Sequence, residues 1–247
     1  MKVSIITIVY NSRETIADAI DSVLSQTYTN IEYIVVDGLS TDGTVEIVKG
    51  YGDRITKFVS EKDGGLYDAI NKGIRMATGD VIGLLHSDDI FYSKESVTAL
   101  AEAFKVNNSD SVYADLVYVD RENTGRIIRN WKSGSYKRHN FIYGWMPPHP
   151  TFYVKREVYE RLGLYDINFK SAADYELMLR YLYKHGISTA YVPECLVRMR
   201  VGGKSNVTLK NRIRANKEDF HAWYINGLQP RFYTRYLKPL RKLTQFL

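Results

Sequence analysis

The sequence predicts an α/β fold with a mainly parallel, doubly wound sheet flanked by helices. Short apolar runs rich in β-branched residues alternate with segments whose apolar residues recur at helical spacing. This alternation favours crossover connections and therefore parallel strands. The 247 residues, of which 45% are hydrophobic, suffice for one sizeable core. Ligands of such sheets bind beyond the carboxyl ends of the strands, so residues there are the first candidates for a site.

The first part of the chain carries the regular alternation. Buried strands are predicted at residues 3–9, 33–36, 55–59 and 81–85. Helices are predicted between them, at 12–24, 44–49 and 66–76, the first starting at Ser12. Two of the strands end in carboxylates, Asp37 and the pair Asp88-Asp89.

The second part is less regular. Helices are expected at 96–106, 156–162 and 174–184, and strands at 111–119, 151–154 and 187–192. Residues 134–145 show little periodicity and are expected to cover the site, and 201–206 are predicted as a flexible loop. Because no repeat or low-complexity linker is present, we expect one compact unit over residues 1–206 and a tail over 207–247.

Cysteine content and hydropathy indicate the compartment. The one cysteine, Cys195, excludes an intrachain disulfide, which fits a reducing cytosol. No signal peptide is visible and no apolar run approaches the roughly 20 residues that span a bilayer. We expect a cytoplasmic protein, with peripheral contact at the inner face of the plasma membrane as a further expectation.

Basic charge is concentrated in the tail. The chain carries +6 overall, with +8 in residues 204–247 and −2 in the rest. Aromatic residues interleave with the basic ones, which suits the headgroup layer of an anionic membrane. The alternative is a helix that packs its rings on the body and leaves its charges in water. Nucleic acid is not expected, since no recognition motif accompanies the charge. The residues concerned are Phe220, Trp223, Tyr224, Phe232, Tyr233, Tyr236 and Phe246, with Arg212, Arg214, Lys217, Arg231, Arg235, Lys238, Arg241 and Lys242.

The Ser87-Asp88-Asp89 turn gives the sharpest chemical signal. Two adjacent carboxylates after a buried strand repel one another unless a cation lies beside them. Hard divalent ions, Mg²⁺ or Mn²⁺, prefer oxygen ligands and bridge to phosphate oxygens. Asp89 is therefore a candidate metal ligand and Asp88 a ribose or metal neighbour. The alternative is a pair of aspartates that only cap the following segment.

Asp37 stands at the end of the second strand. Its carboxylate could accept hydrogen bonds from a base imide or a ribose hydroxyl; the alternative is an aspartate that holds the 38–43 turn. Asp42, which is followed by Gly43-Thr44, is the better candidate for that capping role and leaves Asp37 free.

Four motifs in order resemble the family 2 glycosyltransferases of the GT-A fold. They are residues 4–11 (SIITIVYN), 35–44 (VVDGLSTDGT), 64–73 (GGLYDAINKG) and 77–80 (ATGD), the last leading to Ser87-Asp88-Asp89. The resemblance is firm over about residues 1–115, looser to about 206, and absent from the tail. It implies a GT-A-type, Rossmann-like fold with a nucleotide-binding half (1–115) and an acceptor half (116–206). The Asp-Ala-Ile-Asn-Lys-Gly variant is similar to enzymes that assemble bacterial surface polysaccharides.

The resemblance also implies roles for single residues. Thr7, Val9 and Tyr10 would line the nucleotide pocket by backbone and ring, Asp37 would hold the base, and Asp68 and Asn71 would border the ribose and diphosphate. Asp88 and Asp89 match the family's Asp-X-Asp-type element, with Asp89 the metal ligand. Ile70 stands where relatives often have arginine, so that cationic contact is lost or made elsewhere.

Asp174 is the candidate base, since an acceptor hydroxyl must lose its proton as it attacks the anomeric carbon. Many members of the family carry an acidic residue at this position; Glu176 is the fallback. The alternative is that Asp174 only caps a helix that packs through Leu177 and Met178.

Three further features are weaker candidates. His149, among prolines, could complete the metal shell or contact phosphate, or could be a packed loop residue. Arg198, Arg200 and the 202–205 loop suit a diphosphate, or form a solvated charge cluster. Trp145 could stack on an acceptor sugar or belong to the core.

These expectations combine into a metal-dependent, inverting glycosyltransferase. The donor expected is a nucleoside-diphosphate sugar, UDP-linked, and the acceptor a lipid-linked or growing saccharide of the cell surface. One alternative is a non-catalytic sugar-nucleotide or saccharide-binding partner subunit. A nucleotidyltransferase would require a glycine-rich basic loop after the first strand, and Tyr10-Asn11-Ser12-Arg13-Glu14 is not one.

Overall fold

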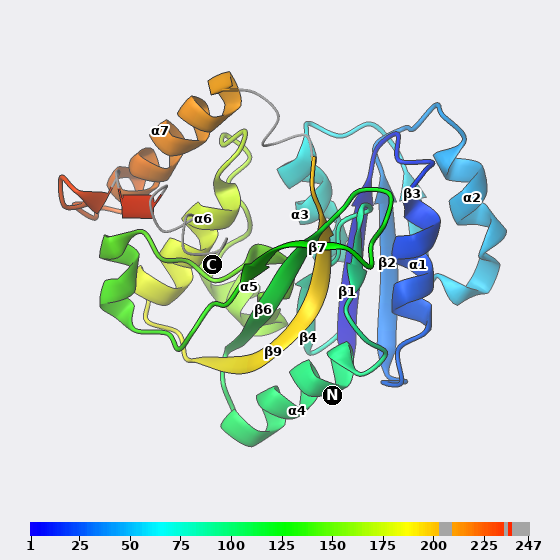
Figure 1. The fold of residues 1–247 in the computed structure, drawn as a ribbon, viewed down its shortest axis with the longest axis horizontal. Helices are drawn as coiled ribbons and strands as arrows, with labels where there is room; N and C mark the ends of the chain where they lie inside the picture. The colour runs from blue at the N-terminus through cyan, green and yellow to red at the C-terminus, as the bar shows by residue number, and fades with distance from the viewer. Residues whose placement is uncertain (203–208, 235–236, 239–247) are drawn as a thin grey trace.

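The computed structural model describes residues 1–202, 209–234 and 237–238. In these residues nine strands form one sheet, in the order β3-β2-β1-β4-β8-β6-β9-β5, with β7 paired to β6 (Figure 1). The expected parallel half consists of β3 (Lys57–Ser60), β2 (Ile31–Asp37), β1 (Val3–Val9) and β4 (Val81–Leu84). The register places Val9 beside Asp37, so the ends of β1 and β2 meet at one edge of the sheet.

The other half of the sheet is mixed. β8 (Tyr153–Lys155) is antiparallel to both β4 and β6 (Ser111–Val119), and β6 is parallel to β9 (Thr189–Arg200). Two strands were not expected: β7 (Ile127–Trp131) and β5 (Asp89–Phe91), which is antiparallel to β9. The segment 187–192, expected as a short strand, instead runs on to Arg200 and thereby gives β5 its partner.

Helices cover both faces of the sheet. Alternate residues of β1 and β2 enter two separate clusters, because neighbouring side chains of a strand point to opposite faces. Ile6 and Val36 join the cluster that includes α3. Ile5 and Val35 join the cluster that includes α1. The α-helices are α1 (Ile16–Leu24), α2 (Thr44–Gly50), α3 (Leu66–Met76), α4 (Ser96–Asn107), α5 (Arg156–Leu162), α6 (Ala173–Met178) and α7 (Leu209–Ile225).

The remaining helices are short or irregular. The predicted helix over 174–184 begins as α6 and continues as the π-helical segment η4 (Leu179–Lys184). The 3-10 helices are η1 (Gly52–Arg54), η2 (Arg138–Tyr143) and η3 (His149–Thr151). The first helix starts at Ile16 rather than at Ser12.

The junction between β4 and β8 is tightly packed. A Cβ placed on Gly83 would lie 2.0 Å from Cε1 of Tyr153, so only glycine leaves room for this ring. Tyr153 is fully buried. The parallel and the mixed halves of the sheet therefore meet without a gap.

Part of the tail packs on the body. α7 lies beside α6 (Figure 1), and its residues Ala222 and Trp223 are 0% and 1% exposed within the same cluster as α3 and α6. The expected tail residues Tyr236, Phe246, Arg235, Arg241 and Lys242 lie outside the described residues.

A buried carboxylate links the amino-terminal ends of β1 and β2. Glu32, 1% exposed, accepts hydrogen bonds from Ser4 Oγ (2.6 Å), the Thr78 amide (2.7 Å) and Thr78 Oγ1 (2.8 Å). Lys57 Nζ lies 2.9 Å from its Oε1. Burial acts to raise the pKa of Glu32, but these donors outweigh it and hold the pKa below its ordinary value.

We expect Glu32→Gln to lower the free energy of unfolding at pH 7 by about 1.5–3 kcal/mol, because a charged acceptor of several buried donors is lost. A depressed folded-state pKa stabilises the fold above the ordinary value of 4.5, and that contribution is lost as the pH falls below it. Urea unfolding at pH 7, 5 and 3.5 should show the difference from wild type shrinking below pH 4.5. Glu102→Gln, at an exposed position of α4, is the control. A difference that stays constant with pH would contradict this role.

Candidate active site

The candidate site lies at the carboxyl ends of β1, β2 and β4. The loops after these strands contact one another: Ser87 Oγ lies 3.1 Å from Ser12 Oγ, and the Gly38 amide donates to the Val9 carbonyl at 3.0 Å. The parallel register brings these ends together, as the sequence predicted. Tyr10 is 51% exposed at this edge.

The side chains of Thr7 and Val9 lie in the core, so these residues can face the site only through their backbone. They are 0% and 1% exposed, and Thr7 Oγ1 takes a hydrogen bond of 3.0 Å from Tyr33 OH. The Val9 carbonyl is engaged by Gly38. Both residues therefore support the edge from the core.

Asp37 is buried and fully partnered in this structure. Its oxygens accept from the Ser40 amide (3.1 Å), Ser40 Oγ (2.5 Å) and Ser60 Oγ (2.6 Å). This arrangement corresponds to the alternative in which Asp37 holds the turn. Asp42 also acts as a cap, accepting from the Thr44 amide at 3.1 Å and from the Arg13 amide at 3.0 Å.

The two predicted residues of α3 differ in their environment. Asp68 is half-buried and accepts from the Gly64 amide at 2.8 Å, so it lies at the start of the helix, facing the loop. Asn71 is only 3% exposed and exchanges two hydrogen bonds with the backbone of Tyr165, at 2.8 and 3.0 Å. The side-chain amide of Asn71 therefore links α3 to the segment around Tyr165, and its predicted place beside the ribose and diphosphate stays a prediction.

Asp88 and Asp89 occupy different environments although they are adjacent. Asp88 is half-buried, whereas Asp89 is 1% exposed in β5. Asp89 Oδ1 accepts from the Arg200 amide at 3.3 Å, while Oδ2 has no hydrogen-bond partner among the described residues. Burial, and after it the charge of Asp88, raise the pKa of Asp89 well above its ordinary value.

Arg200 has a structural role. It is 4% exposed, and its guanidinium donates to the carbonyls of Arg121 (3.1 Å) and Asp88 (3.0 Å) and to the carboxylate of Asp18. β9 is longer than predicted and carries Arg200 into the interior, so a contact of Arg200 with a diphosphate stays a prediction. The hydrogen bond from Arg200 to the Asp88 carbonyl holds the backbone of Asp88 in place.

A chain of three side chains connects β4 to the acceptor half. His86 Nε2 lies 3.0 Å from His149 Nε2, and His149 Nδ1 lies 3.5 Å from Asp174 Oδ2. If Asp174 is ionised, His149 presents Nδ1–H to it and accepts at Nε2, so His86 donates through Nε2–H. His149 and Asp174 remain 24% and 21% exposed, so both can be reached from solvent.

Both imidazoles of this chain are neutral at pH 7. Burial and then the neighbouring His149 lower the pKa of His86 to about 4, against the charges of Asp88 and Asp174. Burial lowers the pKa of His149 to about 4 as well, against the charge of Asp88. Burial raises the pKa of Asp174, and Lys238 is the main group that opposes the shift. Asp174 is therefore more basic than an ordinary aspartate.

The other candidates lie elsewhere. Glu176, the fallback base, is 2% exposed and bound to Arg180 and Asn226, so it cannot meet an acceptor. Trp145 is 4% exposed and donates to the Ser133 carbonyl at 2.8 Å, which makes it a core residue. Arg198 stacks at 4.6 Å over the Tyr92 ring, and residues 203–205 of its loop lie outside the described residues.

His86 had no role predicted from the sequence. Its position directly after β4 and before Ser87-Asp88-Asp89 was the available signal, but only the fold brings it to His149. His149 itself joins His86 and Asp174 instead of a ligand cluster. Among the described residues no three His, Cys, Asp or Glu side chains are grouped so as to hold a metal ion.

The chain is similar in sequence to known proteins. Residues 4–163 match the family model described as "Glycosyl transferase family 2". An uncharacterized glycosyltransferase of Rickettsia typhi is 32% identical over 211 residues, which are 81% of this chain and 64% of the relative. The chain thus spans less than two thirds of that relative's length.

Solved structures share the fold. Residues 1–349 of S. aureus TarS in complex with UDP-GlcNAc align with a TM-score of 0.70 at 19% identity, over 92% of this chain and 65% of that one. The mannosyltransferase PcManGT from Pyrobaculum calidifontis, in complex with GDP-Man and Mn²⁺, aligns with a TM-score of 0.66 at 17% identity, over 99% and 69%.

The curled, mostly parallel sheet confirms the GT-A-type fold, and the family match covers the strand ends where Asp37, Asp88 and Asp89 stand. The chain belongs to glycosyl transferase family 2.

Proposed function

We propose that the protein transfers a sugar from a nucleoside-diphosphate donor to a hydroxyl of a saccharide acceptor. The observation that carries this proposal is the placement of Asp174, basic and reachable from solvent, in one chain with His149 and His86 at the end of β4. Family membership supports it, and so do the UDP-GlcNAc and GDP-Man ligands of two proteins with the same fold.

The donor would bind at the ends of β1, β2 and β4. Tyr10, with its exposed ring, is suited to stack on the base, and Asp68 and Asp88 are the half-buried carboxylates at that edge. Asp37 would act through the turn that it holds, unless Ser40 and Ser60 release it. A UDP-linked donor remains our expectation.

The residues fit a divalent cation. A buried carboxylate oxygen without a partner, beside a second carboxylate, is satisfied by a proton or by a cation. Magnesium-type sites often use one or two carboxylates together with substrate phosphates, which agrees with the lack of a three-ligand cluster in the described residues. Asp88 and Asp89 would hold Mg²⁺ or Mn²⁺, which would offset negative charge on the departing diphosphate.

The reaction would be a single displacement with inversion. The acceptor hydroxyl gives its proton to the Asp174 carboxylate as its oxygen bonds to the anomeric carbon. The bond from that carbon to the diphosphate oxygen breaks, and the nucleoside diphosphate leaves with the electron pair. His149 holds Asp174, and His86 fixes the tautomer of His149. We propose a lipid-linked or growing surface saccharide as the acceptor.

The exposed side of α7 supports a membrane contact near such an acceptor. Ile213, Tyr224 and Ile225 are 50%, 56% and 44% exposed, and Phe232 beyond the helix is 83% exposed. Lys217 and Arg231 lie exposed among them. No helix of the described residues is long and apolar enough to cross a bilayer. We propose that this side rests on an anionic lipid surface while the opposite side packs on α6.

Metal binding is tested by thermal unfolding with UDP or GDP, with and without Mn²⁺. The correct pair should stabilise the wild type by about 2.7 kcal/mol at a hundredfold excess over its dissociation constant. Asp89→Asn should abolish the Mn²⁺-dependent part. Without metal it should match or exceed the wild type, since a raised folded-state pKa means that the charged form costs stability at pH 7. Asp53→Asn, at an exposed site, is the control. An unchanged Mn²⁺ response in Asp89→Asn would exclude the proposed site.

Asp174→Asn tests the base. We expect a loss of on the order of 10²–10⁴ in kcat with unchanged donor affinity, because only proton transfer is removed. The kcat of the wild type should fall on the acid side at a pH above 3.8, as the raised pKa of Asp174 requires. The rate is measured as the formation of UDP from a UDP-sugar in the presence of a saccharide acceptor. Full turnover by Asp174→Asn would refute the mechanism, and donor binding without any turnover by wild type would favour a binding subunit.

Vesicle co-sedimentation tests the membrane contact. The protein should bind vesicles of phosphatidylglycerol and phosphatidylcholine, but not phosphatidylcholine alone, and binding should weaken with salt. Phe232→Ser should reduce binding on the order of tenfold, since burying such a side chain contributes about 1.5–3 kcal/mol. Val106→Ser, 83% exposed on α4, should have no effect. Equal binding by both variants would contradict the assignment.

A further inference from the structure

α7 reaches the segment that leads into α6. Glu218, half-buried in the middle of α7, accepts hydrogen bonds from the backbone amides of Lys170 (3.2 Å), Ser171 (2.8 Å) and Ala172 (3.0 Å). These amides immediately precede Asp174. A carboxylate that gathers three N–H groups fixes their backbone strongly, because hydrogen bonds to charged acceptors are the stronger class. Within α6 itself the described contacts include no side-chain cap.

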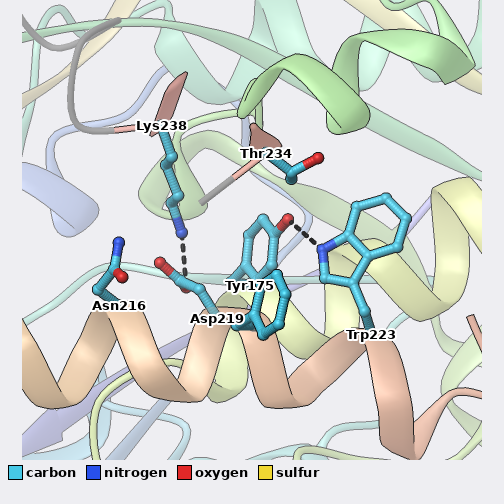
Figure 2. A pocket seen from close by; sticks show the side chains of 7 residues that line it. Tyr175, Asn216, Asp219, Trp223, Thr234 and Lys238 are labelled. Atoms are coloured by element: carbon cyan, nitrogen blue, oxygen red, sulfur yellow. Dashed lines mark hydrogen bonds and ion pairs between the residues drawn. The ribbon is translucent and has the colours of Figure 1, made fainter. Parts of the chain in front are cut away.

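α7 also holds the residues that follow Asp174. Trp223 Nε1 donates to Tyr175 OH at 3.0 Å, and Asn226 Nδ2 donates to Glu176 Oε1 at 3.0 Å. Figure 2 shows the Trp223–Tyr175 bond from the side of the helix. Trp223 and Asn226 are 1% and 5% exposed, so these contacts are shielded from water. Asp174 is therefore bracketed: residues on both sides of it are bound by one face of α7.

Lys238 adds a third contact from beyond the helix. Its Nζ lies 2.6 Å from Asp219 Oδ1 and 3.7 Å from the centroid of the Tyr175 ring, as Figure 2 shows. A Cβ on Gly144, whose φ is +75°, would lie 2.4 Å from the Lys238 amide nitrogen, so the backbone there crosses directly over Gly144. The Lys238 charge lowers the pKa of Asp174 against the effect of burial.

We propose that α7 is part of the catalytic apparatus and that Glu218 is a positioning residue for Asp174. Glu218 sets the backbone from which Asp174 points to His149, although it lies 44 positions later in the chain. The inference rests on the proposed role of Asp174 as the base. It assigns the basic tail a task in the chemistry, separate from any contact of its outer side with lipid.

The test compares Glu218→Ala, Glu218→Gln and Glu218→Asp with wild type, using Glu102→Gln on α4 as the control. Glu218→Ala should lower kcat on the order of 10- to 100-fold, since small misplacement of a reacting group has effects of that size. Donor affinity should stay unchanged, because the proposed donor residues follow β1 and β4 or lie at the start of α3, and Glu218 contacts none of them in the part of the chain that the structure describes. Glu218→Gln, which keeps an acceptor oxygen, should retain more activity than Glu218→Ala. Amide exchange of residues 170–172 should accelerate in the alanine variant.

Each outcome separates the two proposals. A wild-type kcat in both Glu218→Ala and Glu218→Gln, while Asp174→Asn is inactive, would overturn the positioning role and leave the proposed function intact. Full activity of Asp174→Asn would instead refute the function on which the inference rests. A folded Glu218→Gln that loses donor binding in parallel with kcat would show a general structural role and would also overturn the proposal.

Discussion

The antiparallel pairing of β5 with β9 is the constraint on which the site depends. It carries Asp89 into the interior beside the Arg200 amide and leaves Asp88 at the surface of the strand ends. The same pairing brings Arg200 to the Asp88 carbonyl, so a residue of β9 fixes the backbone that follows β4. Burial of Asp89 beside Asp88 raises the pKa of Asp89, and a bound cation would oppose this shift by stabilising the charged carboxylate.

Neutral imidazoles allow the row of contacts from His86 through His149 to Asp174 to form. Two histidines at a distance of 3.0 Å repel one another when both are charged, and burial removes that possibility at pH 7. One ring can then donate and the other accept. Asp174 lies at the end of this row, and burial raises its pKa although its side chain stays partly exposed to solvent. Here the geometry and the protonation states support one another.

The parallel half and its acidic ends were predictable from the sequence, because hydrophobic period and strand order are local properties. Asp174, Asp88 and the capping role of Asp42 follow from such local patterns and from the family resemblance. The buried side-chain contacts of Arg200, Asn71 and Thr7 were not predicted, because a motif gives the position of a residue along the chain but not which side of an element it faces. Glu218 and His86 act through contacts with residues that are far from them in the sequence. The spacing of residues along the chain does not predict such contacts. Whether the tail packs on the body or contacts a membrane could not be predicted from the sequence. Trp223 is buried and Phe232 is exposed, although both lie in neighbouring stretches of the same composition.

The contact of Tyr153 with the bare backbone at Gly83 has a mechanical consequence. A ring packed against the main chain restricts relative movement of the parallel and mixed halves of the sheet. Larger changes of backbone position are therefore expected in segments outside the sheet, such as the residues between β7 and β8.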